Sequence, residues 1–126
     1  MRAVDTNVLV RLITRDNPHQ AAAADAWVGM GAWVSMLALA ETVWVLSTVY
    51  EMKAASIASA VDMLLNHQDL TLQDPDVVSA ALELFRARPR LGFSDCLMLH
   101  LAKKAGHLPL GAFDRNLAGV EGARKL

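Results

Sequence analysis

The sequence predicts an α/β protein in which a parallel sheet of four or five strands lies between layers of helices. Two observations indicate this fold class. Short apolar runs alternate along the chain with longer segments of helical periodicity, which implies right-handed crossovers and parallel strands. The composition, 54% hydrophobic and 20% charged over 126 residues, is typical of a globular chain that can bury one core. A single domain over residues 1–126 is therefore predicted.

The strands are predicted from short apolar or β-branched runs at residues 3–4, 32–36, 70–72 and 108–113. The helices are predicted from apolar residues at helical spacing. One helix is predicted directly after residue 5. The others are predicted at residues 18–28, 37–50, 54–66, 75 to shortly before 89, and 94–105. The run at 37–50 is apolar for too long to be a strand and is predicted to be a buried helix. The tail after residue 114 suggests a short helical turn and an edge strand.

Helix ends are marked by residues that cap helices. Asn17 is a predicted N-cap with Pro18 at the first helical position, and Asp74 with Pro75 repeats this pattern. Ser94 is the predicted N-cap of a later helix, which we expect to end at Gly106.

The composition also excludes several classes of protein. A single cysteine cannot form an internal disulfide, and no apolar run is long enough to span a membrane. An acid at position 5 argues against a secretory signal, so a cytoplasmic protein without a membrane segment is expected. The net charge of −1 does not by itself indicate a nucleic-acid binder.

Four acids are expected at one edge of the sheet. Asp5 and Asp114 each follow a predicted strand, Glu41 lies about one turn into the helix after the second strand, and Asp95 lies in the first turn of a helix. In a parallel sheet with crossover helices, strand ends and helix starts share the edge where ligands bind. The pattern therefore favours a shared acidic site.

Each acid also has a simpler interpretation. Asp5 and Asp114 are residue types that favour turns and helix caps, and Asp95 is favoured in a first helical turn by the helix dipole. Glu41 is the only charged residue between residues 25 and 51, and a carboxylate in so apolar a helix is costly unless it is paired or binds a cation. It could instead face solvent on a polar stripe with Thr42 and Thr48.

Carboxylates gathered without histidine or cysteine partners suit Mg²⁺ or Mn²⁺. The histidines show no zinc-like spacing, and Cys96 is more typical of a buried small side chain than of a nucleophile. No glycine-rich phosphate loop and no Gly-x-Ser-x-Gly turn occurs.

The order and spacing of these motifs resemble the PIN-domain ribonucleases, and more narrowly the VapC-type toxins of bacterial toxin–antitoxin pairs. The resemblance covers essentially the whole chain. It is carried by Val4-Asp5-Thr6-Asn7, by Glu41 in an apolar helix, by Phe93-Ser94-Asp95, and by Phe113-Asp114-Arg115. One departure is Ala112, where the family often has Thr or Ser.

The resemblance implies a PIN-like three-layer sandwich and a metal-dependent endoribonuclease. Asp5, Glu41, Asp95 and Asp114 would form the catalytic and metal-binding pocket, with Thr6 or Asn7 orienting a ligand or water. Mg²⁺ or Mn²⁺ would polarise the scissile phosphate and activate a water, which Glu41 or Asp114 would orient or deprotonate.

The resemblance also implies an RNA substrate, a small cognate antitoxin as partner, and a homodimer. Arg86 and Arg115 are candidates for contacts with the RNA backbone, although surface arginines are common for other reasons. Two other functions fit less well. A PIN-fold binding module acting through protein partners would not need the acids, and an aspartyl-phosphatase motif requires a second aspartate two residues after Asp5, where Asn7 stands.

Overall fold

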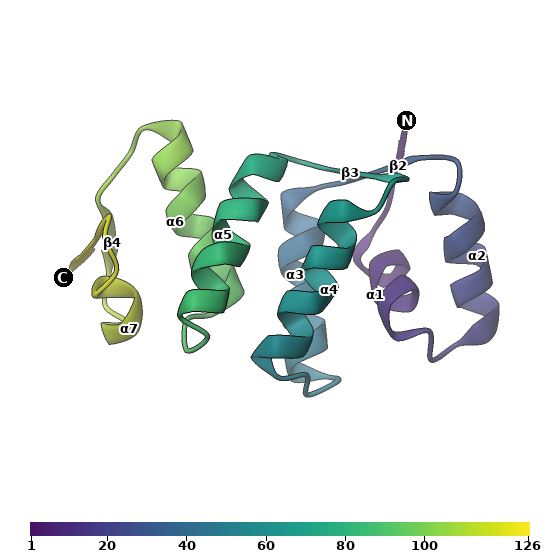
Figure 1. Ribbon diagram of the computed structural model, residues 1–126, viewed down its shortest axis with the longest axis horizontal. Helices are drawn as coiled ribbons and strands as arrows, with labels where there is room; N and C mark the ends of the chain where they lie inside the picture. Colours follow the sequence, from purple (N-terminus) through teal and green to yellow (C-terminus); the bar gives the residue numbers. More distant parts are fainter. The chain divides into compact units, whose positions relative to one another are not determined.

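A computed structural model describes residues 1–126, which form two compact units, Met1–Pro75 and Asp76–Leu126. Figure 1 labels their helices and strands. Each unit is described by itself. No helix in the structure is both long and apolar enough to cross a membrane.

The first unit contains a three-stranded parallel sheet in the order β1-β2-β3. In the register of the sheet, Ala3 pairs with Trp33, and Trp33 pairs with Thr71. The elements run in the order β1 (Arg2–Ala3), α1 (Thr6–Thr14), α2 (Pro18–Val28), β2 (Ala32–Val34), α3 (Met36–Thr48), α4 (Ala54–Asn66) and β3 (Leu70–Leu72). Helix α1 packs against both α2 and α3 (Figure 1).

Side-chain caps define the helix starts in this unit. Asn17 accepts a hydrogen bond from the backbone N–H of Gln20 at 3.0 Å, and Pro18 follows as the first residue of α2, as predicted. Ser35 caps α3 by accepting from the backbone N–H of Ala38 at 3.0 Å. Each cap satisfies a backbone donor that the helix itself leaves without a partner.

The core of the first unit lies on one face of the sheet. Ala32 and Val34 are buried there, whereas Trp33 between them remains 37% exposed on the other face. This alternation follows from the two-residue period of a strand. The helices complete the core with apolar residues that include Leu9, Leu39, Leu46, Val61 and Leu64.

The second unit contains two parallel strands and three helices. The elements are α5 (Pro75–Ala87), whose first residue closes the first unit, α6 (Phe93–Ala105), β4 (Leu110–Ala112), α7 (Arg115–Ala118) and β5 (Ala123–Lys125), with β4 paired to β5. The rings of Phe85 and Phe93 pack edge to face, with centroids 5.7 Å apart. Gly106 ends α6 with a φ of 83°, a left-handed conformation that glycine adopts without strain.

The structure confirms the α/β class, the parallel pairing and most element positions. The helices at 18–28 and 54–66 and the strand at 70–72 lie where they were predicted. Five strands form, as a sheet of three in one unit and a sheet of two in the other, where four or five in a single sheet were expected.

Two local predictions were wrong. Gly92, not Ser94, is the N-cap of α6, so the helix already begins at Phe93. Helix α3 is not buried on all sides, because Leu37 and Trp44 are 76% and 61% exposed. Only one side of α3 packs onto the core. The sequence did not indicate this, because hydrophobic periodicity cannot separate two helix faces that are both apolar.

Candidate active site

Asp5 lies just past the end of β1 and caps α1. Its Oδ1 accepts a hydrogen bond from the backbone N–H of Val8 at 3.1 Å, while the side chain stays exposed. The chain is held against β2 directly before this point, because the N–H of Val4 donates to the carbonyl of Trp33 at 3.1 Å. The cap occupies one carboxylate oxygen and leaves Oδ2 facing away from that bond.

Glu41 lies against the residue that follows Asp5. The Thr6 hydroxyl donates to Glu41 Oε2 at 2.8 Å, which joins the start of α1 to the second turn of α3. Glu41 is exposed, so its carboxylate is not buried in the core despite the apolar sequence of α3. The alternative, a solvent-facing Glu41 on a polar stripe, holds for Glu41 and Thr48, which are both exposed. It fails for Thr42, which is fully buried and donates to the carbonyl of Ala38.

Asp95 and Asp114 are the acids of the second unit. Asp95 lies in the first turn of α6 and is half-buried, with its carboxylate against the backbone of Gly92. Asp114 follows β4 and caps α7, accepting from the backbone N–H of Leu117 at 2.9 Å. Asp114 thus repeats the arrangement of Asp5, in which a strand leads to an aspartate that starts a helix.

The four acids differ from Asp16, Asp25 and Asp76 in their electrostatic partners. Within its own unit, none of the four makes an ion pair with a lysine or arginine. By contrast, Asp25 pairs with Arg15 at 2.7 Å and Asp76 with Lys104 at 3.0 Å. Hydrogen bonds from these cations hold the pKa of Asp25 and of Asp76 below the usual range of a carboxyl group.

The donor chemistry of the four acids fits a hard divalent cation. Asp5, Glu41 and Asp114 each use one carboxylate oxygen in a hydrogen bond, and all the available donors are oxygens. No group of three or more His, Cys, Asp or Glu side chains that could hold a metal ion is found. Each unit supplies two of the four predicted acids.

Among the predicted substrate residues, Thr6 is half-buried, and Asn7, Arg86 and Arg115 are exposed. Asn7 lies in the first turn of α1, Arg86 in the last turn of α5, and Arg115 is the first residue of α7. A pocket of about 330 Å³ in the second unit is lined in part by Arg88, Arg90 and Asn116. Asn116 lies two residues after Asp114, so this pocket brings two arginines of the α5–α6 loop to the start of α7.

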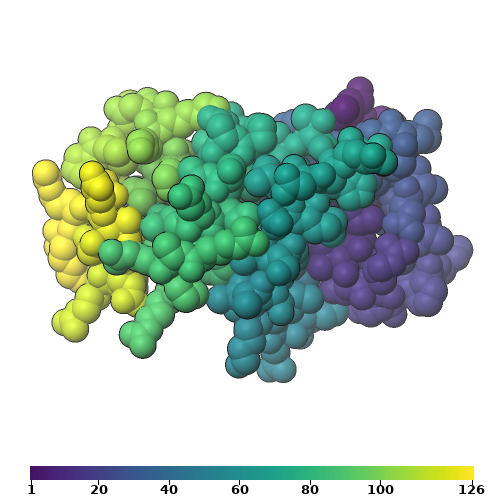
Figure 2. Space-filling view, in the orientation of Figure 1, coloured from purple at the N-terminus to yellow at the C-terminus, as the bar shows by residue number.

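A groove between α1 and α2 was not predicted from the sequence. This α1–α2 groove has a volume of about 460 Å³ and lies entirely in the first unit. It begins at Asp5 and is lined by Asp5, Asn7, Val8, Arg11, Gln20 and Trp27, with two alanines of α2. Figure 2 shows the surfaces of α1 and α2 side by side in purple shades.

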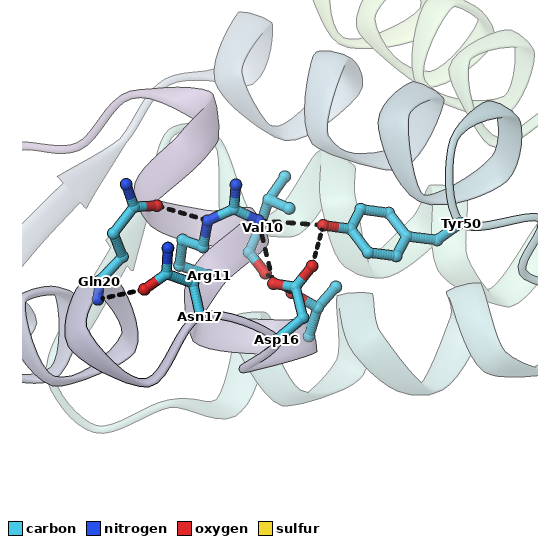
Figure 3. A network of polar contacts seen from close by, with 7 residues as sticks. Val10, Arg11, Asp16, Asn17, Gln20 and Tyr50 are labelled. Atoms are coloured by element: carbon cyan, nitrogen blue, oxygen red, sulfur yellow. Dashed lines mark hydrogen bonds and ion pairs between the residues drawn. The ribbon is translucent and has the colours of Figure 1, made fainter.

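A polar network supports this groove, and no pattern in the sequence indicates it. Arg11 Nη1 donates to Asp16 and to the hydroxyl of Tyr50, both at 3.0 Å, and that hydroxyl donates to Asp16 at 2.7 Å (Figure 3). The hydrogen bond from Tyr50 is the main cause that lowers the pKa of Asp16, and contact with Tyr50 also raises the pKa of Arg11. Tyr50 is 34 residues from Asp16, so only the fold reveals the network.

Parallel strands, with the helix-capping aspartates Asp5 and Asp114 after β1 and β4, define an α/β protein. A family model described as PIN domain matches residues 2–123. The chain therefore belongs to the PIN domain family, whose members are typically metal-dependent nucleases. No curated protein and no solved structure matches the chain.

Proposed function

We propose that this PIN domain is an endoribonuclease that depends on Mg²⁺ or Mn²⁺ and acts as the toxin of a toxin–antitoxin pair. Asp5, Glu41, Asp95 and Asp114 are the acids of its catalytic centre. The family membership supports nuclease chemistry, and the oxygen-only donor set supports a hard cation.

The observation that carries this proposal is the hydrogen bond from Thr6 to Glu41. It brings an acid from α3 to the residue beside Asp5, at the carboxyl end of β1, where ligands bind in parallel sheets. On the exposed surface of α3, Glu41 lies between the apolar side chains of Leu37 and Trp44. A role in holding a cation and a phosphate accounts for both its position and its lack of a basic partner.

The chemistry assigns separate tasks to the side chains. When bound, the divalent cation polarises the scissile phosphate and lowers the pKa of a water. Asp5 and Asp95 are the proposed principal ligands. Glu41, held by the Thr6 hydroxyl, or Asp114 orients the attacking water and accepts its proton. Arg86 and Arg115 are proposed to contact phosphates of the RNA backbone.

The partners follow from the narrower resemblance to VapC-type toxins. We propose that a small antitoxin binds the protein and blocks the acidic centre, and that two copies form a homodimer. Co-expression with the neighbouring open reading frame, followed by sequencing of RNA cleavage ends, tests partner and substrate together. A neighbouring product that neither copurifies nor suppresses cleavage would contradict the toxin role.

The enzymatic proposal is tested with purified protein and RNA. Cleavage should require Mg²⁺ or Mn²⁺, stop on chelation and be lost in Asp5→Asn. The matched control is Asp25→Asn, an exposed acid of α2 that pairs with Arg15 and should cleave normally. Calorimetric titration with Mg²⁺ gives an independent readout. A protein that binds no metal and cleaves no RNA would instead be a binding module that retains the PIN fold.

A further inference from the structure

The α1–α2 groove contains hydrogen-bonding groups that the protein leaves unused. Arg11 Nε donates to Gln20 Oε1 at 2.6 Å. Because arginine can only donate, this bond fixes the oxygen of the Gln20 amide towards Arg11 and leaves the two N–H groups of the amide free. The side chain of Asn7 makes no hydrogen bond within the unit. The groove therefore offers amide donors and acceptors to a ligand.

Gln20 is held in place from several sides. Its backbone N–H donates to Asn17 Oδ1 at 3.0 Å, and its side chain is bonded to Arg11, which Asp16 and Tyr50 fix in turn (Figure 3). A glutamine on a helix surface would ordinarily move among several rotamers. Here the network preorganises the amide, which reduces the entropy lost when a ligand binds.

Trp27 supplies the aromatic surface of the groove. Its Nε1 donates to the carbonyl of Ala3 at 3.0 Å, which fixes the ring beside the end of β1. The guanidinium of Arg2 lies 3.4 Å from the ring centroid. Trp27 lines the groove, whereas Arg2 does not. The side chain remains 38% exposed.

The charge of the groove disfavours an anionic ligand. Arg11 is its only cation, and Asp16 offsets that charge at 3.0 Å. Asp5 adds a negative charge at the end nearest β1. Within the groove, no cation without an acidic partner attracts a phosphate, whereas a flat neutral ligand can contact the indole and use the amides. These are the features by which proteins bind unpaired nucleobases.

We propose that the α1–α2 groove binds one unpaired nucleobase of the substrate, adjacent to the phosphate that is cleaved at Asp5. This inference rests on the proposed ribonuclease function and assigns its base selectivity to Gln20 and Asn7. Trp27 supplies contact with the base that does not depend on its identity. The volume of about 460 Å³ lies in the range of ligand-binding sites.

The test uses the full chain and four fluorescein-labelled 2′-O-methyl tetranucleotides, composed only of A, C, G or U. Affinity is measured by fluorescence anisotropy, and cleavage of ordinary RNA is assayed separately. We expect one oligonucleotide to bind more tightly than the others, and Gln20→Ala to remove most of that preference. Trp27→Ala should weaken all four by about 5-fold or more. The matched control is Trp44→Ala, whose indole is 61% exposed on α3 and should have no effect.

The outcomes separate this inference from the proposed function. If Gln20→Ala and Trp27→Ala leave affinity and preference unchanged while the protein still cleaves RNA, the groove proposal is wrong and the nuclease proposal stands. If the wild-type protein neither binds oligonucleotides nor cleaves RNA, both are wrong. If the groove variants lose only a copurifying polypeptide, that polypeptide occupies the groove and the nucleobase proposal fails. Because Gln20 is exposed, its variant is expected to fold even if Trp27→Ala does not.

Discussion

The first unit holds Glu41 through a tertiary contact, whereas Asp5 and the two acids of the second unit are held locally. Thr6 donates to Glu41 across 35 residues of sequence, so the position of Glu41 depends on how α1 packs against α3. In the second unit, Asp114 bonds a backbone group three residues away, and Asp95 lies against Gly92 of its own helix start. Glu41 should therefore be sensitive to remote packing, and the other three acids to their own helix ends.

The largest expected effect is on cleavage when one acid of either pair is neutralised. We expect Asp5→Asn and Asp95→Asn each to reduce kcat for RNA cleavage by about 100-fold or more. Asparagine is as good an N-cap as aspartate, so Asp5→Asn should keep its helix intact, which circular dichroism can check. If only one of these two substitutions reduces kcat, the proposal that both units contribute acids to catalysis is wrong.

The contact between Thr6 and Glu41 is tested by removing the hydroxyl alone. Thr6→Val should lower kcat by about 3-fold to 10-fold, the equivalent of one net hydrogen bond. Glu41→Gln in the Thr6→Val background should then cost less than it does in the wild type, because the two residues act together. Ser94→Ala is the matched variant beside Asp95, since Ser94 is exposed and caps no helix. An equal loss of kcat in Thr6→Val and Ser94→Ala would contradict the difference between the units in how their acids are held.

Stability should distinguish the two capping aspartates. Asp5→Ala should lower the free energy of unfolding by about 1 kcal/mol, because it removes the cap of a helix that packs against two others. Asp114→Ala should lower it less, because α7 has four residues and fewer backbone bonds depend on its cap. Urea unfolding of both variants measures the difference. A greater loss for Asp114→Ala would contradict this ranking.

The smallest expected effect is a dependence of stability on pH that arises in the second unit. Burial lowers the pKa of His100, and the nearby charge of Lys103 lowers it further. The unfolded state therefore takes up a proton first as the pH falls through about 6.5, and stability decreases until the folded state is protonated too. His100→Gln should flatten the loss between pH 7 and pH 5 in thermal melts. Lys103→Gln should reduce this loss of stability. An unchanged dependence of stability on pH in both variants would refute the assignment to His100.

Cys96 illustrates how well a residue's environment can be anticipated from its type. The sequence suggested a buried small side chain, and the structure leaves it no exposed surface. Burial raises the pKa of its thiol to about 11, so little reactive thiolate exists at neutral pH. Glu41 illustrates the opposite case. Its apolar neighbours suggested a buried charge, yet it lies on an exposed surface that the sequence could not distinguish from the core.

The sequence by itself determined what short-range chemistry controls. Proline and asparagine fixed the start of α2, Gly106 fixed the end of α6, and apolar periodicity located nearly every helix and strand. The order of acids along the chain was enough to indicate the PIN family. Local signals suffice in these cases because a cap or a turn depends on residues three or four positions apart.

Only the tertiary structure decided which side of α3 is exposed and which groups meet across long stretches of sequence. The bond between Thr6 and Glu41, the network around Arg11 and the α1–α2 groove all depend on helix packing. Packing is set by the fit of whole apolar faces, and no short motif encodes which polar residues that fit brings together. The sequence therefore identified the four candidate acids, and the fold showed that a hydrogen bond from Thr6 holds Glu41.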